Sequence, residues 1–186
     1  MPPAELNPSP EDLRTRLSGT NISADTLLAT DYLNHFNEII MMLELVADMP
    51  EMLDDAKSWK PLGYVDHFRF SQFAERDLAI EVYGLIPEPR RRLFEDSVAL
   101  AHARVAGAVT ELDEAIKQGD AGMVRHRCGA IARDLHHLVD NISVIIHGGA
   151  VALDQPDIDG LMAKAADQGS PPVQSIGQDD IDKLFD

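Results

Sequence analysis

Two uninterrupted apolar series dominate the second half of the chain. The first contains Phe94, Val98, Ala101, Val105, Ala108, Leu112 and Ala115, and the second contains Val124, Cys128, Ile131, Leu135, Leu138, Ile142 and Ile145. Steps of three and four residues place side chains on one face of an α-helix. Between the series, Gly119 is suited to ending a helix and Asp120 to starting the next one. The pattern predicts an antiparallel helical hairpin.

The apolar arc of the second arm is wider than one partner helix can cover. Val139 and Ile146 lie beside the seam rather than in it. A third helix or a second subunit must therefore pack there. A further helical series contains Leu33, Phe36, Ile40 and Leu43 and ends near Pro50. We expect an all-α protein in which the hairpin is completed into a bundle, and we expect that bundle to form a homodimer.

The rest of the chain divides by composition. Residues 1–22 are polar and contain prolines, and we expect them to form a flexible N-terminal tail. Residues 23–152 form the predicted bundle domain, in which the aromatic stretch 59–86 should fold into short helices because Pro61 and Gly63 interrupt it. Glycines and prolines make residues 153–174 a predicted linker, and residues 175–186 form a separate terminal peptide.

Charge restricts the classes of partner. The 186 residues include 16 basic and 32 acidic side chains, which gives a formal charge of −16. Such a charge opposes binding to nucleic acid or to anionic lipid. A single cysteine, Cys128, excludes an internal disulfide. The chain shows no apolar run of about 18 residues and no signal-peptide pattern near Met1, so we expect a cytoplasmic protein that does not enter a membrane.

The terminal peptide has the pattern of a captured ligand. In a helix, Ile181, Leu184 and Phe185 fall on one face. Acidic side chains occupy the remaining positions, at Asp179, Asp180, Asp182 and Asp186. This arrangement is typical of an amphipathic segment that binds in an apolar groove of another protein.

The same string resembles a known class of peptides. Ser-Ile-Gly-Gln-Asp-Asp-Ile-Asp-Lys-Leu-Phe, residues 175–185, is similar to the terminal acidic peptides of flagellar switch proteins and chemotaxis phosphatases. Those peptides bind a chemotaxis response regulator. The resemblance implies that the partner is a receiver domain and that Asp179, Asp180, Ile181, Asp182, Leu184 and Phe185 contact it. The preceding linker would raise the local concentration of the bound partner.

A second resemblance lies in the second hairpin arm. His136-His137-Leu-Val-Asp-Asn141 resembles the phosphoacceptor helix of one class of histidine kinases, whose motif reads His-His-Arg-Val-Lys-Asn. His137 matches the phosphoacceptor and Asn141 matches the asparagine, while Leu138 and Asp140 differ from the motif. The resemblance implies that His137 accepts a phosphoryl group. The alternative is that Asp140 and Asn141 orient a water for dephosphorylation, in the way that an acid-plus-amide pair does in chemotaxis phosphatases. The receiver would supply its own Mg²⁺, so we expect no cofactor in this chain.

Alternatives to this regulatory function stay open. The histidine-rich face can be an ordinary solvated surface of a non-catalytic adaptor in the chemotaxis or flagellar system. A metal-binding bundle is a second alternative, because Asp134 and His137 stand at the spacing of one half of a di-iron motif. His126 and His137 lie about 16 Å apart along the helix and cannot share an ion. Cys128 is expected to be a buried apolar residue, and His67 to pack in an aromatic cluster.

Overall fold

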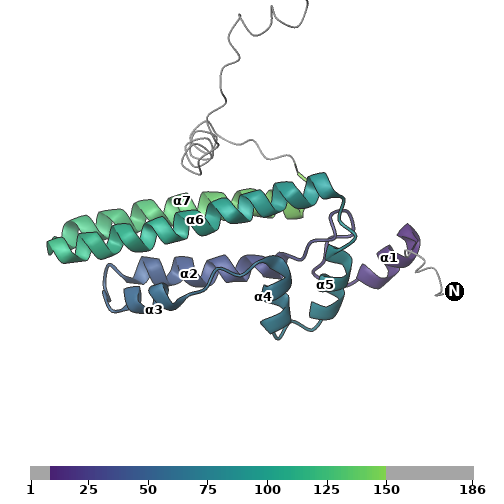
Figure 1. The fold of residues 1–186 in the computed structure, drawn as a ribbon, viewed down its shortest axis with the longest axis horizontal. Helices are drawn as coiled ribbons and strands as arrows, with labels where there is room; N and C mark the ends of the chain where they lie inside the picture. The colour runs from purple at the N-terminus through teal and green to yellow at the C-terminus, as the bar shows by residue number, and fades with distance from the viewer. Residues whose placement is uncertain (1–8, 150–186) are drawn as a thin grey trace, which may run out of the picture. The chain divides into compact units, whose positions relative to one another are not determined.

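The computed structural model describes residues 9–149, and every regular element in that range is helical (Figure 1). In chain order these are α1 (Pro10–Leu17), the 3-10 helix η1 (Thr30–Leu33), α2 (Asn34–Leu45), α3 (Met52–Ser58), α4 (Tyr64–Phe70), α5 (Arg76–Tyr83), α6 (Glu88–Gln118) and α7 (Ala121–Ile146). The predicted all-α fold is therefore confirmed. None of these helices combines the length and the apolar character needed to cross a lipid bilayer.

The hairpin is formed by α6 and α7, which lie side by side (Figure 1). All fourteen side chains of the two predicted seams are buried. Gly119 ends α6 with a φ of +77°, a left-handed conformation that glycine adopts without steric cost. The carboxylate of Asp120 then accepts a 3.0 Å hydrogen bond from the backbone N–H of Met123, which begins α7. The turn follows the prediction at both residues.

An ion pair across the hairpin defines its register. Nη2 of Arg104 on α6 lies 2.9 Å from Oδ2 of Asp134 on α7. In an antiparallel pair, residues earlier in one helix lie opposite residues later in the other. The stretch of α6 near Leu93 therefore lies opposite the stretch of α7 near Val144.

The third helix of the bundle is α2, which packs against α7. It buries Phe36, Ile39, Ile40 and Leu43, and Val139 and Ile146 of α7 are also buried. The hydroxyl of Thr26, in the segment before α2, donates to the backbone carbonyl of Ile146. The apolar arc that required a third helix or a second subunit is thus covered within one chain. Dimerisation stays a prediction about the protein in solution.

The N-terminal region differs from the tail expected over residues 1–22. Ser9 caps α1 by accepting from the N–H of Asp12, and Pro10 occupies the first turn. Leu17 and Ile22 are buried, and the Arg16 guanidinium lies 2.7 Å from the Glu81 carboxylate of α5. The two buried side chains, Leu17 and Ile22, attach this otherwise polar segment to the hydrophobic core. The expected linker 153–174 and peptide 175–186 lie outside the described residues.

The aromatic stretch folds into short helices, as predicted. α3 contacts α2 and α6, and α4 contacts α5 and η1. Tyr64 and Phe68 of α4 are buried, whereas Phe70 at its end is 73% exposed. The aromatic side chains therefore build one end of the core and leave one ring on the surface.

Replacing Asp120 by alanine should lower the free energy of unfolding by about 1 kcal/mol, because the N–H of Met123 loses its acceptor. Urea denaturation monitored by circular dichroism measures the change. Asp120→Asn is the matched control, since its side-chain oxygen can still accept this bond, and it should unfold close to the wild type. An equal loss in both variants would contradict a capping role.

Candidate functional site

The outer face of α7 carries the histidine-rich surface expected from the sequence. Exposed side chains there are Arg133, His136, His137, Asp140 and His147, while Asn141 is half-buried. Beneath them, Leu135, Leu138 and Ile142 are buried in the seam. The face is thus polar and accessible, and its helix is held from below by the core.

The structure brings two of the three predicted catalytic residues together. Nδ2 of Asn141 lies 3.5 Å from Nδ1 of His137, one helical turn away. Because amide nitrogen and oxygen atoms can be exchanged by a flip, the pair fits either tautomer of the imidazole. Asp140 is exposed at the adjacent position of the helix. The other histidine of the motif, His136, lies with Nε2 3.4 Å from Oε1 of Glu44 on α2.

Apolar side chains are exposed close to this pair. Val144 is 40% exposed and lies seven residues after His137, which is two turns along the same face. Leu93 is also 40% exposed, and the register places it opposite Val144. A partner that reached His137 would therefore also meet the apolar side chain of Val144.

The predicted partner-binding residues belong to the terminal peptide. Asp179, Asp180, Ile181, Asp182, Leu184 and Phe185 all lie outside the described residues. Their role stays a prediction from the sequence.

No cluster of three or more His, Cys, Asp or Glu side chains in residues 9–149 is arranged to hold a metal ion. Asp134, which formed the possible half-motif with His137, is bound to Arg104 of α6. Cys128 is buried in the seam, and burial raises the pKa of its thiol. It is therefore an inert core residue, as the sequence suggested.

Sequence reasoning missed a second group of titratable residues, which surrounds His35. The His35 ring stacks on Trp59 at 4.4 Å between centroids and lies 5.6 Å from the rings of His67 and His102. Nε2 of His35 accepts a 3.1 Å hydrogen bond from the N–H of Leu62. Burial lowers the pKa of His35 to about 3 and that of His102 to about 4, so both rings are neutral at physiological pH. The expectation that His67 packs among aromatic rings is confirmed.

Three polar atoms in this region are buried without a hydrogen-bond partner. They are Oδ2 of Asp31, Nε1 of Trp59 and Nε2 of His102. An unpaired buried polar group costs roughly 1 to 3 kcal/mol. Such groups are rare in native proteins, and those that occur often lie at functional sites.

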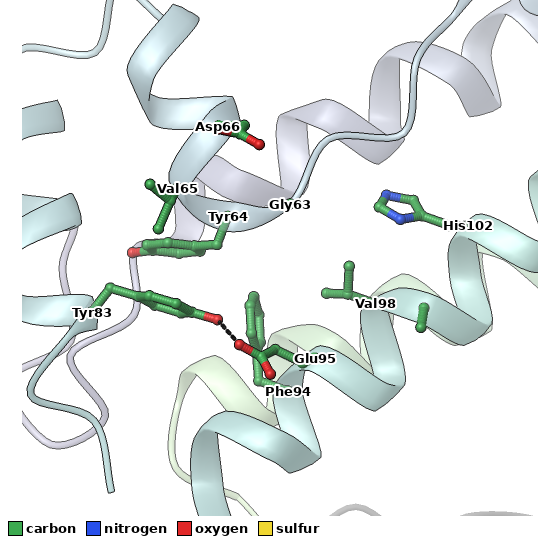
Figure 2. Close-up of a pocket in the computed structure, with 10 residues that line it drawn as sticks. Gly63, Tyr64, Val65, Asp66, Tyr83, Phe94, Glu95, Val98 and His102 are labelled. Carbon is green, nitrogen blue, oxygen red and sulfur yellow. Dashed lines mark hydrogen bonds between the residues drawn. The ribbon is translucent and has the colours of Figure 1, made fainter. Parts of the chain in front are cut away.

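A pocket of about 360 Å³ adjoins the cluster (Figure 2). It is lined by Gly63, Tyr64, Val65 and Asp66 from the start of α4, by Tyr83 of α5, and by Phe94, Glu95, Val98, Ala99 and His102 of α6. The Tyr83 hydroxyl donates a 2.8 Å hydrogen bond to Oε1 of Glu95. Burial raises the pKa of Tyr83, which therefore stays a neutral donor. His102 also lines a second pocket, of about 260 Å³, together with Trp59.

The only signal for this pocket in the sequence was the concentration of aromatic residues between 59 and 86. His102 follows the seam residue Ala101, so the heptad pattern alone gave it no special role. Its neighbours include His35, which lies 67 residues earlier, and only the folded chain brings the two rings together.

Comparisons with protein-family models, with curated proteins and with solved structures found no match for this chain. The function must therefore be argued from its own residues.

The buried neutral histidines predict acid sensitivity. Their pKa values are lower in the folded state than in the unfolded chain, so the unfolded state binds more protons. Above about pH 6.5 these rings therefore do not reduce the free energy of unfolding. As the pH falls toward 4, the free energy of unfolding drops by up to about 1.4 kcal/mol per pH unit for each ring.

Urea midpoints measured between pH 7.5 and pH 5 test this expectation. His102→Leu should give a shallower pH dependence, because one titrating ring is gone. The control His126→Gln replaces an exposed histidine of α7 and should follow the wild-type profile. Parallel profiles for His102→Leu and the wild type would show that His102 does not titrate on unfolding.

Proposed function

We propose that this protein binds a chemotaxis-type receiver domain and acts on its aspartyl phosphate from the outer face of α7. The observation that carries the proposal is the pairing of His137 with Asn141 on an accessible helix face. An imidazole and an amide are groups that can attack a phosphoryl group or orient a water toward it. Since receiver domains of this class are cytoplasmic, the proposal includes a cytoplasmic location.

The rigidity of the arm supports this function. Phosphoryl transfer depends mainly on positioning, because the reacting atoms must be aligned. α7 is held by the seam with α6 on one side and by α2 on another. A side chain on such an arm keeps its position when a partner docks.

The chemistry open to His137 follows from its tautomer. If the amide oxygen of Asn141 accepts from Nδ1–H, a lone pair remains on Nε2. That lone pair can attack phosphorus, so that an N–P bond forms while the P–O bond to the partner's aspartate breaks. Alternatively, Nε2 takes a proton from water as the water oxygen attacks, which yields inorganic phosphate. In both cases the partner supplies the Mg²⁺ and recovers a free carboxylate.

The terminal peptide supports a capture step before the chemistry. Its pattern Gln-x-Asp-Ile-Asp-x-Leu followed by a bulky apolar residue covers residues 178–185 and also occurs at 155–162, 23 residues earlier. The two copies differ at three of these positions. At the sixth position of the pattern the later copy has Lys183 where the earlier one has Gly160, and the other two differences are Asp179 against Pro156 and Phe185 against Met162. Glycine costs about 1 kcal/mol more than lysine in a helix. The later copy is therefore the better ligand if the partner binds it as a helix.

An adaptor function without chemistry is the second candidate. The exposed side chains of Val144 and Leu93 favour it, since they offer apolar contact to a partner without taking part in a reaction. In that case the protein would hold the regulator and leave its phosphorylation unchanged.

Leu184→Ala combined with Phe185→Ala should weaken binding of the receiver domain by about 10²-fold or more. Each buried apolar anchor contributes roughly 1.5 to 3 kcal/mol. The matched control is Leu161→Ala combined with Met162→Ala in the earlier copy, which should change affinity much less. Isothermal titration calorimetry with the purified receiver domain measures both. Unchanged binding in the first variant would refute capture by the terminal peptide.

His137→Ala should lengthen the lifetime of the partner's aspartyl phosphate by about 10²-fold relative to the wild-type protein, as expected for loss of a nucleophile or base. Asn141→Ala should have a smaller effect in the same direction. Decay of radiolabelled phosphoreceiver is the measurement, and trapping of labelled phosphohistidine on the wild type distinguishes transfer from hydrolysis. His126→Ala, another exposed histidine on α7, is the control. If His137→Ala binds the receiver and its aspartyl phosphate decays at the wild-type rate, the enzymatic function is refuted and the adaptor function remains.

A further inference from the structure

Arg133 is the basic residue that stands one turn before His137 on α7. A separation of four residues places two side chains next to each other on one helix face, about 6 Å apart along the axis. The Arg133 side chain is exposed, as are His136 and His137. A partner that reaches His137 therefore also reaches this cation.

No ion pair to Arg133 is formed within residues 9–149, although acidic residues lie around it. Asp134 follows it directly, and Glu44 and Asp48 line the same groove. All three are held by other basic side chains, in the pairs Asp134–Arg104, Glu44–His136 and Asp48–Arg125. The exposed Asp140 stands two turns further along α7, about 10 Å away on the axis. The guanidinium can therefore bind an anion that a partner brings.

The groove between α2 and α7 leaves this guanidinium room to move. It has a volume of about 320 Å³, and small residues such as Gly129 and Ala132 line it. Nη1 of Arg133 lies over Gly129, 3.6 Å from the point where a β-carbon would stand on that residue. Because the side chain is long and exposed, a change of rotamer moves the guanidinium along the helix face without disturbing the core.

The imidazole of His137 has its two nitrogens on different sides. Nδ1 lies 3.5 Å from Nδ2 of Asn141, which is one turn toward the C-terminus. Nε2 is across the ring from Nδ1, on the side away from Asn141. Arg133 is one turn toward the N-terminus. The nitrogen that would meet phosphorus is therefore on the side of the ring where Arg133 lies.

We propose that the Arg133 guanidinium binds the oxygens of the phosphoryl group while that group reacts at His137, an inference that rests on the proposed function. An attacking atom approaches phosphorus to about 3 to 3.5 Å, and a guanidinium N–H binds an oxyanion at about 2.7 to 2.9 Å. Together these distances reach about 6 Å, the rise over the four residues from 133 to 137. One phosphoryl group can therefore contact both side chains.

Arg133 forms and breaks no covalent bond in this step. Its positive charge offsets the negative charge on the phosphoryl oxygens as the P–O bond to the partner's aspartate breaks. Arginine presents parallel N–H groups to two oxygens at once, whereas lysine acts as a point charge. The chemistry therefore predicts a difference between arginine and lysine at this position.

The experiment follows the decay of radiolabelled phosphoreceiver at increasing concentrations of the full-length protein. Such a series separates the maximal rate from the concentration that gives half of it. Arg133→Gln should lower the maximal rate about 10-fold to 10²-fold and change the half-saturating concentration little, because capture belongs to the terminal peptide. Arg133→Lys should lower the maximal rate by less, about threefold to tenfold, because the charge remains but the paired N–H groups do not.

Arg127→Gln is the matched control. It removes the same charge from the same helix, about 15 Å from His137 along the axis, and its decay rates should equal those of the wild type. Glutamine is nearly as good a helix former as arginine, so urea midpoints of all these variants should stay close to the wild type.

Equal maximal rates in Arg133→Gln and Arg127→Gln, with acceleration by the wild type, would overturn the inference and leave the proposed function standing. A rise in the half-saturating concentration alone would also overturn it, because Arg133 would then only dock the partner. If the wild-type protein does not accelerate decay at all, the proposed function is refuted and this inference is refuted with it.

Discussion

The apolar seam between α6 and α7 is the interaction on which the other features depend. On α6 its side chains alternate alanine with larger residues, and the seam side chains of both helices are buried. Removing such a continuous strip from water is the main favourable contribution to the fold, and it requires both helices to be straight and in register. The Arg104–Asp134 ion pair adds a specific contact in that register. Because the seam occupies one face of α7, the opposite face is left for polar residues, and His137 lies there.

The third helix completes the core but also brings polar groups into it. α2 supplies Phe36, Ile39 and Ile40 to the core, and the same helix carries His35 into the cluster with Trp59 and His102. Neutral histidines and unpaired buried atoms are less favourable there than apolar side chains of similar size. The part of the core that is least favourable for stability is thus the part that adjoins the pocket. Such a position is typical of binding sites, where stability is reduced in favour of recognition.

The two candidate sites use different kinds of structure. The α7 face is built from residues one to two turns apart on a single helix, so its geometry follows from helix periodicity and its rigidity from the seam. The pocket is built from three helices and depends on the aromatic contacts that hold α4 and α5 against α6. A change in the packing of the short helices would alter the pocket and leave the α7 face nearly unchanged. The two candidate sites can therefore be altered separately by substitution.

Local patterns in the sequence determined the hairpin, its turn at Gly119 and Asp120, and the exposure of His137, because each depends only on neighbours within a few turns of helix. Tertiary structure decided which element covers Val139 and Ile146, since a helix of the same chain and a second subunit bury apolar surface equally well. It also decided the attachment of α1 through Leu17 and the meeting of His35 with His102. These contacts join residues far apart in the chain, and their free energy depends on shape complementarity that no local pattern encodes.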